Sequence, residues 1–290
     1  MSSSKYALLV GCNYTNVPSC TLHGCIDDIV NMSTALAQMG YSSNNIVMLR
    51  DDSSDPALLP TKANILAQLQ SLIAKSANTG TTEIWFHYSG HGTQVTDRNR
   101  DEVSGLDGCI VPMDFLDQGF IIDDDLFTIF NGSKCPTMIL TDSCFSGTVC
   151  DLPYSIEYVR GNTYRYTQNN TAKMTNTKVV MISGCKDTQT SADIYDYQQS
   201  EYEGAFTDAF VRSLGATSYR GSLGTVYVNT VSWLRQNGFD QIPILSSSVA
   251  TPSWSFGGNN VPVAPSAPVV STSSSKPNRR RNPKRRMVLF

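Results

Sequence analysis

The sequence predicts an α/β fold in which a mostly parallel central β-sheet has helices on both faces. The first observation behind this prediction is an alternation. Short apolar runs rich in β-branched and aromatic residues are separated by segments whose apolar residues recur at helical spacing. The second is that two apolar runs stop abruptly at small residues, within segments 86–92 and 140–147. Buried parallel strands look like this where they reach the surface at their carboxyl ends, which is where an open α/β sheet places chemistry.

The individual elements follow from the helical spacing of apolar residues and from the short apolar runs typical of strands. Segment 27–39 shows the helical period, because Ile29, Met32, Leu36 and Met39 fall on one face. The other expected helices span 63–73, 124–130, 204–214 and 226–236. The expected strands span 6–11, 46–49, 83–88, 138–141, 179–183 and 242–245.

Two stretches interrupt this pattern. Segment 161–178 is rich in Asn, Thr, Gln and Tyr and is interpreted as an exposed connection. The segment after residue 257 has too little apolar surface to offset the entropy of ordering, so it is predicted to be disordered. The predicted organisation is a first catalytic part, a connection, a second part of the same domain and a tail, at 1–160, 161–178, 179–257 and 258–290.

The net charge of −3 hides an asymmetry between the body and the tail. Seven Lys and Arg residues and no acid lie in segment 276–290, which leaves 15 basic and 25 acidic residues in the rest of the chain. The tail can be a solubilising end, or it can serve nuclear import or salt-sensitive contact with nucleic acid. Contact with nucleic acid is expected only through this tail.

The cysteines and the lengths of the apolar runs indicate the cellular compartment of the protein. The eight cysteines form no Cys-x-x-Cys pair, and only three histidines accompany them, so a zinc site is not expected. Several cysteines lie in apolar strand-like runs, where free thiols behave as small hydrophobes. A cytoplasmic location is the simplest interpretation, with the nucleus as an alternative through the tail. The chain contains no apolar run of roughly eighteen residues, so no membrane contact is expected.

The two strand ends deliver a histidine and a cysteine, His91 and Cys144. An imidazole beside a thiol can take up the thiol proton and stabilise the thiolate, which is sufficient for nucleophilic attack on a carbonyl. A lone cysteine is more often an inert buried thiol. Cys144, however, follows a strand and lies opposite a second strand that ends in His-Gly, and this placement favours catalysis. His87 lies four residues earlier within its strand and is expected to belong to the packed sheet.

With both segments in place, the chain resembles the metacaspases, a family of caspase-like cysteine peptidases, in their type I layout. The resemblance covers residues 6–248, and several motifs in the family's order carry it. They are Leu-His-Gly-Cys-Ile-Asp-Asp at 22–28, His-Tyr-Ser-Gly-His-Gly at 87–92, Ile-Asp-Asp at 122–124, Asp-Ser-Cys-Phe-Ser-Gly-Thr at 142–148, the segment 183–192 and Gly-Ala-Phe at 204–206. The resemblance implies a caspase-like fold and a monomer. Phe145 departs from the pattern, because many relatives have histidine there.

The resemblance also assigns residues around the catalytic pair. It implies that the amides of Gly92 and Cys144 form the oxyanion hole. It places four residues around the pocket for the residue before the cut bond, namely Cys25, Asp28, Ser89 and Asp142. Two carboxylates in such a pocket would favour Arg or Lys and repel Asp. Asp28 has a competing interpretation as a first-turn helix residue favoured by the macrodipole.

Acidic residues are dense between the two catalytic strands, and their oxygen atoms suit Ca²⁺. By resemblance to calcium-dependent metacaspases, the matching positions are Asp107, Asp123, Asp124 and Asp151. The alternative is a solvated acidic loop with a helix N-cap at Asp123. This segment has fewer acids than many relatives, because Asn99, Ser104 and Gly108 stand at positions where relatives often have Asp or Glu.

The function expected is a calcium-stimulated cysteine endopeptidase that cleaves peptide and protein substrates after Arg or Lys. Its own Arg-rich tail, and the connection 161–178, would then be candidate substrates for self-processing. Two alternatives remain: a legumain-like peptidase acting after Asn or Asp, and a catalytically weak or inactive caspase-like scaffold or regulator.

Overall fold

The computed structural model of the chain describes residues 4–96, 105–143, 150–161, 163–169, 174–184 and 204–258. Cys144, the acidic residues of segment 97–104 and the tail from residue 259 lie outside the described residues.

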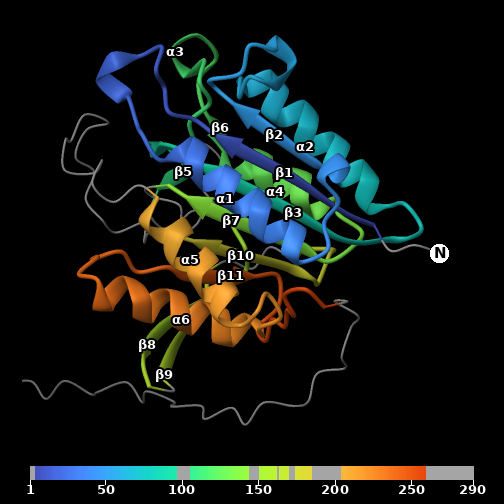
Figure 1. Cartoon of the computed structure of the whole chain (residues 1–290), viewed down its shortest axis with the longest axis vertical. Helices are drawn as coiled ribbons and strands as arrows, with labels where there is room; N and C mark the ends of the chain where they lie inside the picture. The colour runs from blue at the N-terminus through green and yellow to red at the C-terminus, as the bar shows by residue number, and fades with distance from the viewer. Residues whose placement is uncertain are drawn as a thin grey trace, which may run out of the picture.

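An eight-stranded sheet forms the centre of the molecule, and five of its strands are parallel (Figure 1). Its order is β2 (Ile46–Arg50), β1 (Ser4–Gly11), β3 (Thr81–Ser89), β7 (Thr137–Asp142), β10 (Val179–Ser183), β11 (Ile244–Ser247), β8 (Tyr154–Arg160) and β9 (Thr163–Gln168). The last three pair antiparallel. The predicted α/β fold, with a mostly parallel sheet, is confirmed.

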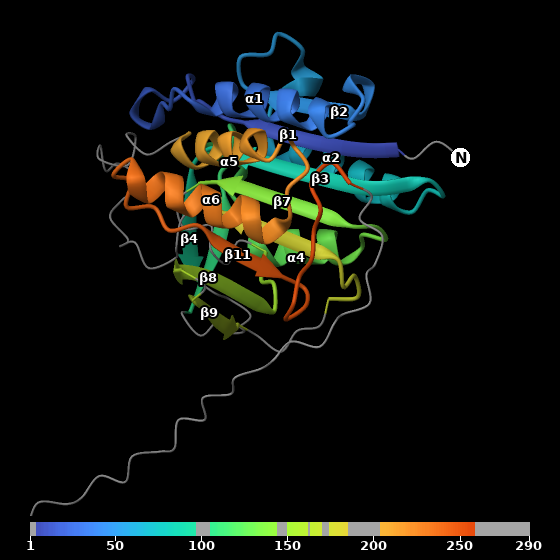
Figure 2. The ribbon, with the colours of Figure 1, turned by 60° about the horizontal axis from the view of Figure 1, so that its bottom comes forward.

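Helices cover both faces of this sheet. They are α1 (Cys25–Gln38), α2 (Lys62–Ser76), α3 (Phe115–Gln118), α4 (Asp123–Asn131), α5 (Ala205–Ala216) and α6 (Leu223–Gln236). Short 3₁₀ turns lie at η1 (Pro18–Cys20), η2 (Ser43–Asn45) and η3 (Pro56–Leu58). Figure 2 shows α1, α5 and α6 on one face of the sheet, with α5 and α6 side by side.

The strands divide the core in two because side chains alternate between faces. Leu9 and Trp85 join the cluster beneath α1, α5 and α6. Their neighbours Leu8 and Phe86 join the cluster that includes residues of α2 and α4. Strands buried on both sides are the reason that the parallel strands read as continuous apolar runs.

A three-stranded sheet and a hairpin differ from the expectation. A second sheet contains β4 (Gly92–Thr96), β5 (Leu106–Ile110) and β6 (Ile121–Ile122), where the sequence suggested an acidic loop. In addition, β8 and β9 form a hairpin that extends into segment 161–178. Polar residues or glycine interrupt β4, β5, β8 and β9, and β6 has only two residues, so pairing decides whether these segments form strands.

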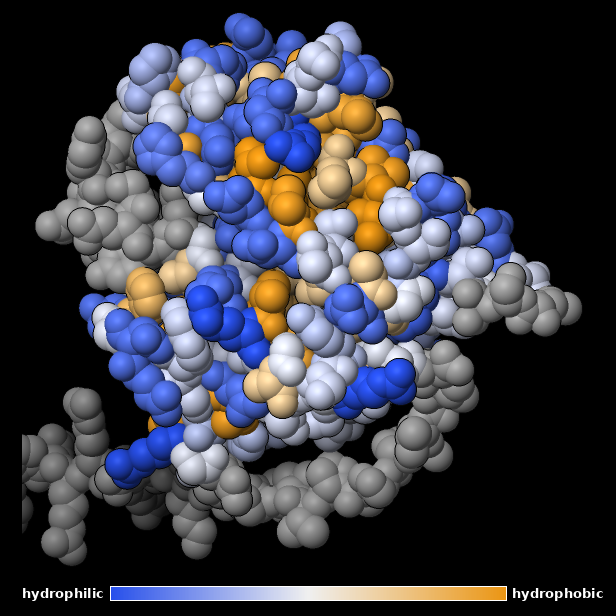
Figure 3. Space-filling model, viewed as in Figure 1, coloured by the Kyte–Doolittle hydropathy of each residue, from blue (hydrophilic) through white to orange (hydrophobic). Residues whose placement is uncertain are grey.

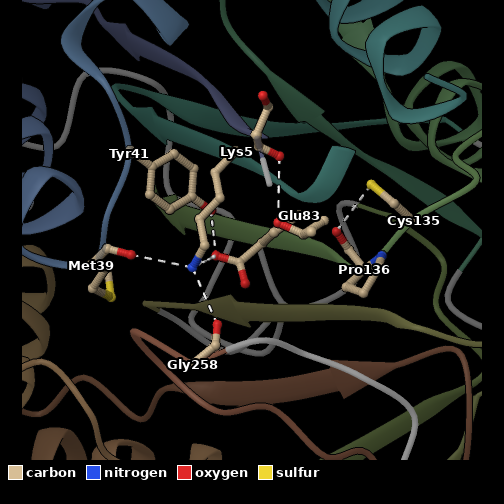
Figure 4. A network of polar contacts seen from close by, with 9 residues as sticks. Lys5, Met39, Tyr41, Glu83, Cys135, Pro136 and Gly258 are labelled. Carbon is tan, nitrogen blue, oxygen red and sulfur yellow. Dashed lines mark hydrogen bonds and ion pairs between the residues drawn. The ribbon is translucent and has the colours of Figure 1, made fainter. Parts of the chain in front are cut away.

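A buried ion pair joins the amino-terminal strand to the end of the described chain (Figure 4). Lys5 Nζ lies 3.4 Å from Glu83 Oε1 and donates to the carbonyls of Met39 and Gly258. Tyr41 donates to the same Glu83 oxygen over 2.6 Å. Side chains of Lys5 and Glu83 are 8% and 3% exposed. Four segments distant in sequence therefore meet at one buried charge pair.

The outer face is mainly polar. In the space-filling view, apolar residues gather mostly in the upper half of the face, around α1 and the edge strand β2 (Figure 3). Within the described ranges, the helices include none that is both long and apolar enough to cross a membrane.

Candidate active site

The carboxyl ends of the central strands meet at one edge of the sheet, as the sequence predicts. Gly11 is in register with Ser89, and Ser89 with Asp142. The ladder continues past the strand ends, because Gly90 N donates to Asp142 O and Gly184 N donates to Thr141 O. Segments that carry chemistry-bearing residues therefore emerge side by side.

His91 is half-buried at this edge, and its ring has a defined partner. The imidazole Nε2 lies 2.8 Å from the carbonyl oxygen of Cys20 in η1. A carbonyl can only accept, so Nε2 carries the hydrogen and Nδ1 is the nitrogen that can receive a proton. Burial lowers the pKa of His91, while the bond to the Cys20 carbonyl opposes that shift. The ring is consequently neutral near pH 7, as a general base must be.

His87 has a different environment and lies in the packed sheet. It is fully buried, and burial lowers its pKa to about 3. Its Nε2 lies 3.4 Å from the hydroxyl of Thr207. This ring stays neutral and lies behind the strand end rather than at it.

Three of the four predicted pocket residues, Asp28, Ser89 and Asp142, lie together. Ser89 donates to Asp28 Oδ2 over 2.7 Å. Burial, and then the charge of Asp142, raises the pKa of Asp28 to about 8. Burial raises the pKa of Asp142 to about 6, against hydrogen bonds that lower it. Cys25 is buried as the first residue of α1, and its N–H donates to Asn13 Oδ1. A pair of acids whose pKa values are raised in this way stabilises a cation placed between them.

Two residues of this pocket were missed in the sequence. Thr207 donates to Asp142 Oδ2 through its N–H, over 2.9 Å, and through its hydroxyl, over 2.8 Å. Gly204 has a φ of 80°, and a Cβ added there would lie 3.2 Å from Asp28 Oδ1. Both belong to the motif around Gly-Ala-Phe, and that motif was the only available signal.

The four predicted calcium ligands are found in three elements. Asp107 is buried in β5, Asp123 and Asp124 begin α4, and Asp151 is buried with a positive φ of 43°. Asp123 accepts from the N–H groups of Gly108 and Asp124, so it also satisfies the first turn of α4.

Burial, and then the charges of three of these acids, act on two buried thiols. The charges of Asp123 and Asp107 help to raise the pKa of the buried Cys109 to about 12. Those of Asp151 and Asp123 help to raise the pKa of Cys150. The oxygen chemistry suits Ca²⁺, but among the described residues no three His, Cys, Asp or Glu side chains are grouped as a metal site. The ligand set therefore stays a prediction.

The nucleophile and part of the oxyanion hole cannot be placed, because Cys144 is outside the described residues. Gly92, the other predicted oxyanion donor, begins β4 directly after His91 and pairs with Ile110 of β5. Its role as an oxyanion donor stays a prediction.

Comparison with known proteins points to one family. A family model described as metacaspase, peptidase C14 domain, matches residues 5–153. Metacaspase-1 of Scheffersomyces stipitis is 35% identical over 85% of this chain and 71% of its own length. Metacaspase-1 of Cryptococcus neoformans is 34% identical over 85% of this chain and 63% of its own length. Metacaspase-1 of Kluyveromyces lactis is 38% identical, and the chain spans 58% of its length.

Solved structures show the same fold at low sequence identity. Caspase-1 of Spodoptera frugiperda superposes with a TM-score of 0.56 at 12% identity, covering 90% of this chain and 93% of that one. A protein of Geobacter sulfurreducens superposes with a TM-score of 0.55 at 21% identity, covering 87% and 93%. The predicted caspase-like fold is confirmed.

Proposed function

Because the chain belongs to the metacaspase family of caspase-like cysteine peptidases, we propose that it is an endopeptidase that cleaves after Arg or Lys. Cys144 is the nucleophile, His91 is the base and acid, and Asp28 with Asp142 selects the substrate. The observation that carries this proposal is the pair of buried carboxylates, Asp28 and Asp142, whose pKa values are both raised, beside the strand end that bears His91.

The proposed reaction uses His91 twice. Its Nδ1 takes the proton of the Cys144 thiol, and the thiolate attacks the carbonyl carbon of the substrate. The oxyanion that forms accepts hydrogen bonds from the amides of Gly92 and Cys144. The C–N bond then breaks, and His91 returns the proton to the leaving amine. Water, activated by the same imidazole, hydrolyses the thioester and regenerates the thiol.

Charge supports a basic residue before the cut bond. Asp28 and Asp142 raise one another's cost of ionisation, and a guanidinium or ammonium group between them removes that cost. An Asp side chain would add a third carboxylate and be repelled. An Asn side chain would leave the acids uncompensated, which disfavours the legumain-like alternative.

In a panel of fluorogenic peptides that differ in the residue before the cut bond, we expect those with Arg or Lys to be cleaved and those with Asn or Asp not to be. Asp142→Asn keeps an acceptor for Thr207 but removes a charge, so it should lower kcat/KM for the Arg peptide by roughly tenfold or more. The same variant should cleave a citrulline peptide, which has a neutral side chain of Arg shape, at the wild-type rate. Cleavage of the Asn peptide by the wild type would favour the legumain-like function, and no cleavage at all would favour the scaffold.

Calcium stimulation forms part of the proposal. Asp107, Asp123 and Asp151 are buried, and buried carboxylates supply the oxygen ligands that a divalent cation such as Ca²⁺ prefers. We expect the peptidase rate to rise with free calcium and to fall again with a chelator. Asp151→Asn should require more calcium for half-maximal rate. A rate that does not change with calcium would remove this part of the proposal.

Self-processing is directed to the tail rather than to the described part of 161–178. Arg165 lies in β9, paired with Glu157 of β8 both in the ladder and by an ion pair of 2.9 Å. A peptidase needs an extended, unpaired segment, so this hairpin is protected while it is paired. Intact masses measured during the calcium titration should show loss of the Arg-rich tail in the wild type and none in Cys144→Ala. Equal masses would reject self-processing.

A further inference from the structure

At the start of β4 a side chain completes the hydrogen bonding of the main chain. Opposite residues in a hydrogen-bonded antiparallel pair normally exchange two N–H···O=C bonds. The β4–β5 register, continued by one residue, sets His91 opposite Val111, and Val111 N donates to His91 O over 3.2 Å. In the other direction, His91 N donates to the Tyr14 hydroxyl over 3.0 Å, and that hydroxyl donates to Val111 O over 2.6 Å. A phenol oxygen is therefore inserted into the ladder at the residue that carries the proposed base.

A second hydroxyl completes the arrangement. Tyr88 accepts from Val111 N over 3.1 Å, and its hydroxyl lies 2.7 Å from His91 O and 2.9 Å from Val111 O, so it can donate to His91 O while Tyr14 donates to Val111 O. The two hydroxyls lie 3.0 Å apart, and this assignment uses the single hydrogen of each once. Gly90 makes room for them, because a Cβ there would lie 2.7 Å from Tyr88 Oη and 2.9 Å from Tyr14 Oη.

Tyr14 also acts on the imidazole itself. Its ring packs against the ring of His91 with 4.8 Å between centroids. Its carbonyl accepts from Val17 N, and the carbonyl of Val17 accepts from Cys20 N. The carbonyl of Cys20 is the partner of His91 Nε2. One residue thus holds the amide of His91, one face of its ring and the turn that orients Nε2.

The backbone of Tyr14 is held in an unusual conformation. It is fully buried and has a φ of 52°, in the left-handed region that bulky residues rarely adopt. Its N–H donates to Asp51 Oδ2 over 2.5 Å, which keeps it there. Backbone strain of this kind persists where the surroundings over-determine a conformation, and it clusters at functional sites.

We propose that Tyr14 is the positioning residue of His91: its hydroxyl bridges His91 N and Val111 O, and its turn carries the carbonyl that orients the imidazole. The inference rests on the proposed peptidase function, because the alignment of a base matters only if the base reacts. A loss of alignment lowers the rate of the chemical step and leaves binding in the separate acidic pocket unchanged.

The test compares two variants that remove one buried hydroxyl each. Tyr14→Phe keeps the ring, and we expect kcat on the Arg peptide to fall roughly 10- to 100-fold with KM near that of the wild type. Tyr41→Phe is the matched control, because Tyr41 is also buried and its hydroxyl donates to Glu83 near the opposite end of β3. The control should lower the unfolding temperature without changing kcat.

A second variant decides the matter if Tyr14→Phe does not fold. Asp51→Ala removes the acceptor of the Tyr14 N–H from a half-buried position, so kcat should fall with KM unchanged. The proposal is overturned if Tyr14→Phe folds and has the kcat of the wild type. If Tyr14→Phe does not fold, the proposal is overturned when Asp51→Ala has the kcat of the wild type. A wild type without peptidase activity contradicts the proposed function instead, so the two failures are distinguishable.

Discussion

Replacing His91 with alanine is expected to lower kcat/KM for the Arg peptide by about 10²- to 10⁴-fold, the usual contribution of a general base. Without the imidazole, the thiol of Cys144 is left with only a small thiolate fraction at neutral pH. The leaving amine also loses its proton donor. His23→Ala is the control, because His23 is exposed and belongs to neither the pocket nor the His91 contacts. Activity of His91→Ala within tenfold of the wild type would contradict the role of this residue.

The titration of His91 should also determine the acid limb of the pH–activity profile of the wild type. Burial lowers the pKa of His91, and the proton-accepting form is the neutral one. Activity is therefore lost as the pH falls through this lowered pKa, which puts the acid limb below the ordinary histidine value of about 6.5. A citrulline peptide is the right substrate for this measurement, because Asp28 and Asp142 titrate in the same range and alter the binding of Arg. An acid limb above the ordinary value would show that the ring is not buried in solution.

Replacing Lys5 with methionine is expected to lower the free energy of unfolding by about 3–5 kcal/mol, because it leaves the buried carboxylate of Glu83 without its counter-ion. The carbonyls of Met39 and Gly258 also lose the ammonium group that they accept from. The hydroxyl of Tyr41 would still donate to Glu83, but a neutral hydrogen bond does not replace the charge of the lost ammonium group. Denaturant unfolding measures the loss.

A double variant separates the lost charge from lost packing. Lys5→Met with Glu83→Leu removes both charges and keeps apolar volume, so it should recover most of the stability that the single change loses. Both residues lie at the end of the sheet opposite Ser89, so kcat of the folded protein should stay at the wild-type value. A double variant as unstable as Lys5→Met would show that packing, and not the unpaired charge, accounts for the cost.

Helices and strands with a buried apolar pattern could be predicted from the sequence to within a few residues. The helix expected at 27–39 is α1, and the strand expected at 179–183 is β10. The strands β4, β5, β8 and β9 are not expected from the sequence, because polar residues or glycine interrupt each of them, although β5 and part of β8 are buried. Pairing partners far along the chain decide whether such segments form strands.

The candidate site divides in the same way. His91 is expected at the site because it follows an apolar run, whereas Cys25, Asp28, Ser89 and Asp142 are expected there because they match family motifs. Thr207, Tyr14 and the Cys20 carbonyl could not be predicted, since a hydroxyl or a main-chain oxygen acquires its role only from what lies within hydrogen-bond distance.

By itself, the sequence determined the fold class, the edge of the sheet where chemistry is placed, and the residue types delivered to that edge. These follow from local periodicity and from the points where apolar runs end. Only the tertiary structure decided that Asp28 and Asp142 are buried close enough for their charges to interact, and that Tyr14 enters the ladder beside His91. Strand register and helix packing set the distances between residues far apart in the chain, and those distances determine ionisation and hydrogen bonding.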